Sequence, residues 1–285
     1  MRFDMKSLLA ATALAAFLSA PVLAQAPAVV PYRYAATTPS NCVDPAGFPN
    51  FLNQMRREAQ AQGVSPRGLA ALDGLTFEIG IVRRDRGQKV FTQTFEEFSG
   101  RMVPPRMGRA VQMMKRHASL LSRIEQEFGV PPGVLVAIWG LETDFGAYLG
   151  DFPTVKALAT LAYDCRRPEK FRPELIDVLK IVDRGDIDPA TARGAWAGEI
   201  GQTQFMPSSY MKFAIDYDRD GRRDLVKSIP DVLGSTANYL RGHGWQRGQG
   251  WGPGQPNFAA IQEWNKAPVY ARTIAHFAER LEAAK

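Results

Sequence analysis

One carboxyl group, that of Glu142, stands at the end of an apolar segment that runs from residue 134 to residue 141. Pro131 and Pro132 come just before it, where a helix does not need their missing N–H groups, so the segment predicts a buried helix. On that helix Glu142 would share its face with three apolar residues: Leu135, Ile138 and Trp139. Apolar surroundings raise the pKa of a carboxyl group, which can then donate a proton to a leaving oxygen at neutral pH. The pattern indicates a general acid of carbohydrate chemistry, and an acid that caps or salt-bridges the inner end of a core helix is the alternative.

The other reactive side chains form weaker patterns. Asp144 follows Glu142 by two residues, roughly 200° around a helix, and is therefore a poor second carboxylate for the same site. The three histidines lie far apart without the spacing of metal ligands: His117, His243 and His276. The sequence holds neither a Gly-x-Ser-x-Gly nucleophile motif nor a phosphate-binding loop. Glu142 therefore remains the strongest candidate for chemistry.

A second pattern, between residues 216 and 224, has the ligand spacing of an EF-hand calcium loop. Acids occupy positions 1, 3, 5 and 9 and a glycine occupies position 6: Asp216, Asp218, Asp220, Asp224 and Gly221. The carbonyl group of Arg222, at position 7, would join the acids around a hard cation. Position 12 is Lys227, where a bidentate glutamate is expected, and Asp231 at position 16 is the natural substitute. We expect a structural calcium ion in loop 216–231, and a solvated acidic turn neutralised by neighbouring arginines is the alternative.

A third pattern, from Gly194 to Tyr210, is rich in glycine and enters a helix at Pro207. Glycines let the backbone approach a ligand closely, so this segment is a candidate wall of a binding site.

The beginning of the sequence has the composition of a secretory signal peptide over residues 1–24, with cleavage expected after Ala24. Residues 25–40, rich in proline, predict an irregular lead-in. No later stretch is apolar for the roughly 20 residues that a membrane span requires. The two cysteines, Cys42 and Cys165, would form one disulfide in an oxidising compartment, and two buried thiols are the alternative.

The net charge is +6, of which the signal peptide carries +1 through Arg2, Lys6 and Asp4, so the mature chain keeps about +5. A basic surface favours association with polyanions, which for an exported protein are those of the cell wall and envelope rather than nucleic acid.

Helical patterns dominate the rest of the chain, and no run of alternating strands is present. Helices are predicted over 48–61, from Ser65–Pro66, around 91–98, over 106–128 and over about 261–281. The fold class is therefore mainly α with little β structure. A catalytic region over 41–245 would be followed by a Gly/Pro linker over 246–256 and by a C-terminal helical segment over 257–285.

Taken together, the motifs and their order resemble the lytic murein transglycosylases of the B type, which have a lysozyme-like catalytic core. The matching motifs are Glu-Thr-x-Phe-Gly at 142–146, Gly-Gln-x-Gln-Phe-Met-Pro-Ser-Ser-Tyr at 201–210, the acidic loop, Gly-Ser-Thr-Ala-Asn-Tyr-Leu at 234–240 and His-Gly-Trp at 243–245. The resemblance runs from about Phe48 to the C-terminus. It implies a lysozyme-like core embedded in an α-helical domain.

The resemblance also implies the roles of individual residues. Glu142 would be the sole catalytic acid and base. Four residues would contact the substrate, the last two from the C-terminal segment: Gln204, Phe205, Asn265 and Tyr270. The calcium ligands would be Asp216, Asp218, Asp220, Asp231 and the carbonyl group of Arg222. No organic cofactor is implied.

Two positions depart from the family pattern. A serine that faces the substrate in the family is Ala195 here, so one polar contact is missing or supplied by another group. The linker from Gln246 to Pro256 is short where longer relatives insert a subdomain, so the far end of the cleft would be more open.

The implied activity is cleavage of the β-1,4 bond between N-acetylmuramic acid and N-acetylglucosamine in periplasmic peptidoglycan. The 6-hydroxyl group of the muramic acid would attack its own anomeric carbon and form a 1,6-anhydro product, so a second carboxylate is not needed. Cell-wall machinery proteins are candidate partners, whereas nucleic acid is not. The alternatives are a hydrolytic muramidase, with Asp144 or Glu199 activating water, and a calcium-stabilised peptidoglycan-binding protein without catalysis.

Overall fold

The protein was analysed as a computed structural model, which describes residues 44–87 and 93–284. The predicted signal peptide (1–24), the lead-in (25–40), Cys42 and Phe91 lie outside the described residues. The disulfide between Cys42 and Cys165 therefore stays a prediction.

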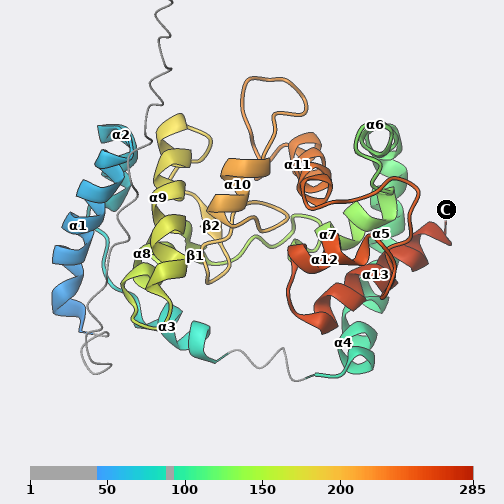
Figure 1. Cartoon of the computed structure of the whole chain (residues 1–285), viewed down its shortest axis with the longest axis horizontal. Helices are drawn as coiled ribbons and strands as arrows, with labels where there is room; N and C mark the ends of the chain where they lie inside the picture. Colours follow the sequence, from blue (N-terminus) through green and yellow to red (C-terminus); the bar gives the residue numbers. More distant parts are fainter. Residues whose placement is uncertain (1–43, 88–92, 285) are drawn as a thin grey trace, which may run out of the picture. The chain divides into compact units, whose positions relative to one another are not determined.

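The described part of the chain is mainly helical, as expected (Figure 1). Its first elements are the 3-10 helices η1 (Pro45–Gly47) and η2 (Ala70–Leu72) and the helices α1 (Phe48–Ala61), α2 (Pro66–Leu69), α3 (Ile79–Arg86), α4 (Phe95–Met102), α5 (Pro104–Arg116), α6 (Ala118–Phe128) and α7 (Pro132–Thr143). After them come β1 (Phe152–Pro153), α8 (Thr154–Tyr163), α9 (Pro168–Arg184), β2 (Arg193–Gly194), α10 (Pro207–Phe213), α11 (Ile229–Gly242), α12 (Phe258–Trp264) and α13 (Pro268–Glu282). The two short strands pair antiparallel.

Local sequence signals explain where many helices begin. Proline stands at the first position of α2, α5, α7, α9, α10 and α13, where its fixed φ angle fits the first turn. Side-chain caps mark other starts. The hydroxyl group of Thr94 accepts a hydrogen bond from the N–H of Glu97, whose carboxylate accepts one from the N–H of Thr94, and this capping box opens α4.

The helix predicted over 106–128 is two helices, because the chain leaves helical geometry at His117, with φ −108° and ψ 21°. The break lets α5 pack against α7 while α6 packs against α11. Each half thus buries its apolar face against a different neighbour.

The C-terminal helix predicted over about 261–281 is also two helices, α12 and α13. Asn265 is extended, with φ −143° and ψ 117°, and Pro268 begins the second helix. Proline has no N–H to continue a helix and restricts the residue before it, which explains the separation.

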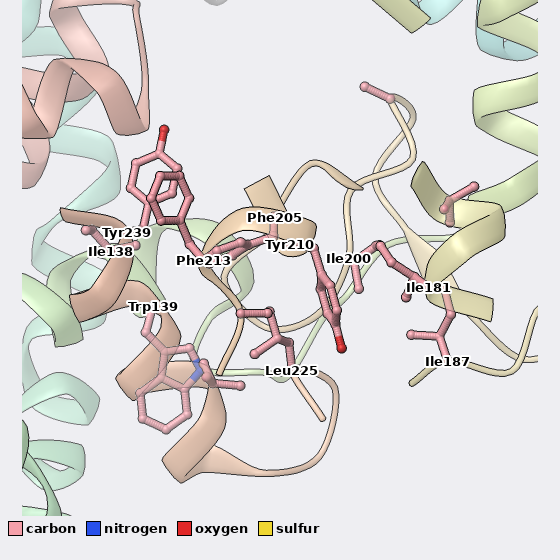
Figure 2. Packing of buried hydrophobic residues seen from close by; sticks show 14 of the residues in the cluster. Ile138, Trp139, Ile181, Ile187, Ile200, Phe205, Tyr210, Phe213, Leu225 and Tyr239 are labelled. Atoms are coloured by element: carbon pink, nitrogen blue, oxygen red, sulfur yellow. The ribbon is translucent and has the colours of Figure 1, made fainter. Parts of the chain in front are cut away.

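The buried helix predicted after Pro131 is confirmed as α7, and it lies at the centre of the core. Leu135 and Ile138 are fully buried and Trp139 is 1% exposed. Helix α13 packs along α7, α8 packs along α9, and α10 contacts both α9 and α11. Figure 2 shows four buried side chains of the segment 200–225 in the middle: Ile200, Phe205, Tyr210 and Leu225. Ile181 and Ile187, in and near α9, lie on one side of them. Trp139 of α7 and Tyr239 of α11 lie on the other side.

The side chain of Gln202 ties these parts together by hydrogen bonds. The indole Nε1 of Trp139 donates to its Oε1 at 2.8 Å, and its Nε2 donates to the carbonyl group of Val226 at 2.9 Å. The main chain of Gln202 donates to the carbonyl group of Leu225 at 2.8 Å and accepts from the hydroxyl group of Thr143 at 2.5 Å. This residue therefore fixes the glycine-rich segment to the end of α7 and to the chain that follows the acidic loop.

We expect Gln202→Ala to lower the free energy of unfolding by about 2–4 kcal/mol, because it leaves the buried N–H of Trp139 and the carbonyl group of Val226 without their partner. Chemical denaturation measures this loss. Gln60→Ala on the exposed side of α1 is the control, with an expected change within about 0.5 kcal/mol. Equal stability of the two variants would contradict the structural role of Gln202.

Candidate functional site

A cleft of about 640 Å³ contains Glu142, and we call it the Glu142 cleft. Its lining includes residues from α7, from the glycine-rich segment and from α12 with the residues after it: Glu142, Ala195, Glu199, Gln204, Phe205, Trp264 and Asn265. Three of the motifs that lie far apart in the sequence thus meet at one surface. The size and the mixed polar and apolar lining suit an extended polar ligand such as a sugar chain.

Glu142 has the environment of a proton donor. The indole Nε1 of Trp264 donates to its Oε1 at 2.9 Å, and the hydroxyl group of Tyr270 is also hydrogen-bonded to this carboxyl group. Burial raises the pKa of Glu142 to about 7, the two hydrogen bonds oppose this rise, and the charge of Glu199 adds to it. At neutral pH a large fraction of the group therefore holds a proton.

Asp144 lies just beyond the end of α7 and does not line the described cleft. Its backbone is left-handed, with φ 50°, and its carboxylate pairs with the guanidinium group of Arg106 at 2.8 Å. The Nε atom of Arg106, which makes this ion pair, also donates a hydrogen bond to the carbonyl group of Gly140. Asp144 is thus a structural partner of Arg106, in agreement with its predicted unsuitability as a second carboxylate.

Gln204 lines the cleft, and its side-chain amide forms hydrogen bonds with backbone groups of the protein. Its Oε1 accepts from the N–H of Ala195 at 3.2 Å, and its Nε2 donates to the carbonyl groups of Leu149 and Gly201 at 3.2 and 2.8 Å. The residue itself is left-handed, with φ 54°. Gln204 therefore shapes the wall on which Ala195 lies.

Phe205 is 2% exposed and lies in the lining of the cleft. Its backbone pairs with that of Ile200, and its ring contacts the rings of Tyr239 and Trp264 edge to face at 5.8 and 5.4 Å. Phe205 thus braces the indole that donates to Glu142.

The C-terminal segment reaches the cleft, as the sequence predicted. Asn265 lines it, and its Oδ1 accepts from the N–H of Ala267 at 3.0 Å. Tyr270 contacts Glu142 from α13. Trp264 was not predicted as a site residue, because the 122 positions between it and Glu142 leave no local signal of their contact.

The linker after α11 is held in place by Asn257, which is fully buried. Its Nδ2 donates to the carbonyl groups of Gln246 and Gln249 at 2.8 and 2.9 Å, and its Oδ1 accepts from the N–H of Gln246 at 2.7 Å. This closed turn sets the start of α12 and hence the position of Trp264.

A basic wall at one side of the cleft is a second feature that the sequence analysis missed. Arg166 and Arg167 both pair with Asp85, whose side chain is 1% exposed, and Arg86 pairs with Asp164 at 2.6 Å. These five charged groups come from α3 and from the turn between α8 and α9, so only the fold brings them together.

The acidic loop brings together three of its five predicted calcium ligands. Carboxylate oxygens of Asp216, Asp218 and Asp231 all lie within 4.8 Å of one another. Asp231 is fully buried and accepts hydrogen bonds from the N–H groups of Tyr217, Asp218 and Asp224. Converging carboxylate oxygens are the donor set of a hard cation such as Ca²⁺, so these residues fit the ion.

The carboxylate of Asp220 does not belong to this cluster in the described structure. The carboxylate of Asp220 accepts from the N–H of Arg222 at 2.9 Å. Asp224, at the ninth position of the loop, instead caps the turn that follows by accepting from the N–H groups of Val226 and Lys227.

Comparison with known proteins places this geometry in a family. Residues 47–255 match the Transglycosylase SLT domain. The chain is 37% identical over 164 residues to the membrane-bound lytic murein transglycosylase B of Escherichia coli (strain K12), a match that covers 55% of this chain and 45% of that protein. The chain thus spans about half the length of this curated relative.

Solved structures give a wider match. SltB3 from Pseudomonas aeruginosa in complex with NAG-NAM-pentapeptide has a TM-score of 0.78 and 28% identity, over 82% of this chain and 79% of that chain. The Escherichia coli lytic transglycosylase Slt35 in complex with calcium has a TM-score of 0.72 and 25% identity, over 82% and 93%. These similarities confirm the predicted lysozyme-like, mainly α fold. The chain belongs to the Transglycosylase SLT domain family, as a relative of the B-type lytic transglycosylases.

Proposed function

We propose that the protein is a peptidoglycan lytic transglycosylase that cleaves the β-1,4 bond between N-acetylmuramic acid and N-acetylglucosamine and leaves a 1,6-anhydromuramoyl end. The observation that carries this proposal is the carboxyl group of Glu142, which is partly buried in the cleft, hydrogen-bonded to Trp264 and Tyr270, and has a pKa raised to about 7. Family membership supports the reaction class.

In this mechanism Glu142 acts twice. Its protonated carboxyl group first donates to the glycosidic oxygen, so that the N-acetylglucosamine leaves as an alcohol. The resulting carboxylate then takes the proton of the muramic acid 6-hydroxyl group while that oxygen bonds to the anomeric carbon. The enzyme is returned to its starting protonation state, and no water is consumed.

The neighbours of Glu142 suit both steps. Trp264 and Tyr270 hold the carboxyl group in one orientation through hydrogen bonds. Both can also stabilise the carboxylate that forms after the first proton transfer. Burial favours the protonated state at the start, and the hydrogen-bond donors limit the cost of the charged one.

The hydrolytic alternative now depends on Glu199, since Asp144 pairs with Arg106 away from the cleft. Glu199 lines the same cleft as Glu142 and is the remaining carboxyl group that could activate water there. The identity of the product separates the two reactions, because hydrolysis adds one water.

Glycan strands of peptidoglycan are the proposed substrate, supported by the complex of the similar SltB3 with NAG-NAM-pentapeptide.

Export to the periplasm, with a signal peptide cleaved after about Ala24, is part of the same proposal and is supported by the composition of residues 1–24. Among residues 44–87 and 93–284, no helix is long and apolar enough to cross a membrane. We also propose a catalytic region over 41–245, a linker over 246–256 and a C-terminal helical segment over 257–285. Cell-wall machinery proteins are proposed as partners.

We also propose a structural calcium ion in loop 216–231, held by Asp216, Asp218 and Asp231. The approach of their oxygens supports it, as does the similarity to Slt35, which has been solved in complex with calcium. Asp220 and the carbonyl group of Arg222 would complete the set. The ion would supply a positive charge that holds the acids together, without a part in bond cleavage.

We expect Glu142→Gln to lower the rate of lysis of purified sacculi by about a thousandfold, because glutamine cannot donate or accept the proton. Mass spectrometry of the wild-type products should find anhydromuropeptides. Glu169→Gln on the exposed surface of α9 should retain activity. Reducing ends heavier by one water would identify a hydrolytic muramidase, and wild-type protein without lytic activity would indicate a binding protein.

We expect kcat/KM to fall as the pH rises through about 7, because the raised pKa of Glu142 places its loss of the donated proton there. Below that pH the acid is protonated and the first step is supported. Initial rates on a soluble glycan between about pH 5 and about pH 9 measure the profile. A rate that keeps rising through this whole range would rule out Glu142 as the acid.

We expect saturating Ca²⁺ to raise the thermal unfolding midpoint by about 5–10 °C over the value in a chelator, since the ion binds only the folded loop. Asp218→Asn should remove most of this increase. Asp73→Asn, an exposed acid outside the loop, should keep it. An identical midpoint with Ca²⁺ and with the chelator would exclude a calcium site.

A further inference from the structure

Glu199 is a second carboxyl group on the wall of the Glu142 cleft, and the proposed mechanism gives it no task. It stands in the glycine-rich segment, between Gly198 and Ile200. It shares the lining of the cleft with Glu142, Ala195 and Gln204. A ligand that occupies the cleft next to Glu142 can therefore also contact the carboxyl group of Glu199.

The backbone around Glu199 is fixed by close packing. Gly198 has φ +80°, and a Cβ atom there would lie 2.4 Å from the side chain of Leu158 in α8. A Cβ atom on Gly194 would lie 1.9 Å from the carbonyl oxygen of Glu199 itself. Neither glycine leaves room for a side chain, so the turn that carries Glu199 packs closely against α8 and against itself.

The carboxyl group of Glu199 accepts hydrogen bonds from the backbone and also lines the cleft. Oε2 of Glu199 accepts from the N–H of Ala197 at 3.0 Å. Ala195, on the same wall, has no polar side-chain atom. Trp196, which also lines the cleft, offers only an N–H donor, so Glu199 is the side chain of this turn that can accept a hydrogen bond from a ligand.

The charge of Glu199 is not neutralised by an ion pair with any residue in the described ranges. Two other carboxylates that line the cleft differ in this respect: Glu263 pairs with Lys266 at 2.5 Å, and Asp85 pairs with Arg166 at 2.5 Å. Burial raises the pKa of Glu199, its hydrogen bonds to the backbone oppose this, and the charge of Lys170 opposes it further. A partly buried carboxyl group without an ion pair is costly, and hydrogen-bond donors of a ligand would offset that cost.

We propose that Glu199 is a further substrate-contacting residue, whose carboxylate accepts a hydrogen bond from a hydroxyl group or an acetamido N–H of a sugar bound next to Glu142. These are the donors that an N-acetylated sugar offers, and an ionised carboxylate only accepts. The inference rests on the proposed function, because it concerns the same glycan in the same cleft. It makes Glu199 a determinant of affinity rather than of proton transfer.

The test measures binding without turnover, in the Glu142→Gln background. Isothermal titration with a peptide-free tetrasaccharide of alternating N-acetylglucosamine and N-acetylmuramic acid compares Glu142→Gln with Glu142→Gln/Glu199→Ala. We expect the second change to weaken binding about tenfold or more, as for the loss of a hydrogen bond to a charged group. Glu142→Gln/Glu169→Ala removes the same charge from an exposed position on α9 and should bind within about twofold of Glu142→Gln.

Glu199→Gln keeps the size of the side chain and an acceptor for the N–H of Ala197, so it tests the contact with the turn intact. In the otherwise wild-type enzyme it should raise KM severalfold with little change in kcat, whereas a structural role would instead lower the unfolding midpoint.

Equal affinities of Glu142→Gln and its Glu199→Ala derivative would overturn the role of Glu199 and leave the proposed function in place. Absence of tetrasaccharide binding by Glu142→Gln itself would overturn the proposed function, and the role of Glu199 with it.

Discussion

The hydrogen bonds of Gln202 are the constraint on which the site depends. Apolar packing alone is non-directional and would allow α7, the glycine-rich segment and the chain after the acidic loop to slide against one another. Gln202, with two partners of its side-chain amide and two of its main chain, removes this freedom, because each displaced partner would be left unsatisfied in a dry interior. The end of α7, where Glu142 stands, is therefore set by polar geometry inside an apolar core.

The same core sets the proton affinity of Glu142 through two opposing effects. Burial favours the neutral form, while the donors Trp264 and Tyr270 favour the charged one, and burial is the larger effect. This environment has a cost in stability. As pH rises from the range of an ordinary carboxyl group to about 7, the native state retains a proton that the unfolded chain releases, so the stability contribution of the group declines across that range.

The parts of the structure that could be predicted from the sequence are those with local causes. The apolar run and the prolines before it specify α7, and the alternating acids specify the loop at 216–224. The break at His117 was missed because packing of the two halves against different neighbours separates them, whereas the break at Asn265 has a local cause, Pro268, that was overlooked. The roles of Trp264 and of Asp85 depend on contacts between distant segments, for which one sequence has no signal.

The contact between Trp264 and Glu142 spans 122 positions, and its direction along the chain has a consequence for biosynthesis. Ribosomes add residues in order, so the acid is made well before the indole that orients it. A nascent chain shorter than 264 residues carries Glu142 without that partner and without the support of α13. Formation of the contact between Glu142 and Trp264 therefore requires that α12 has been synthesised.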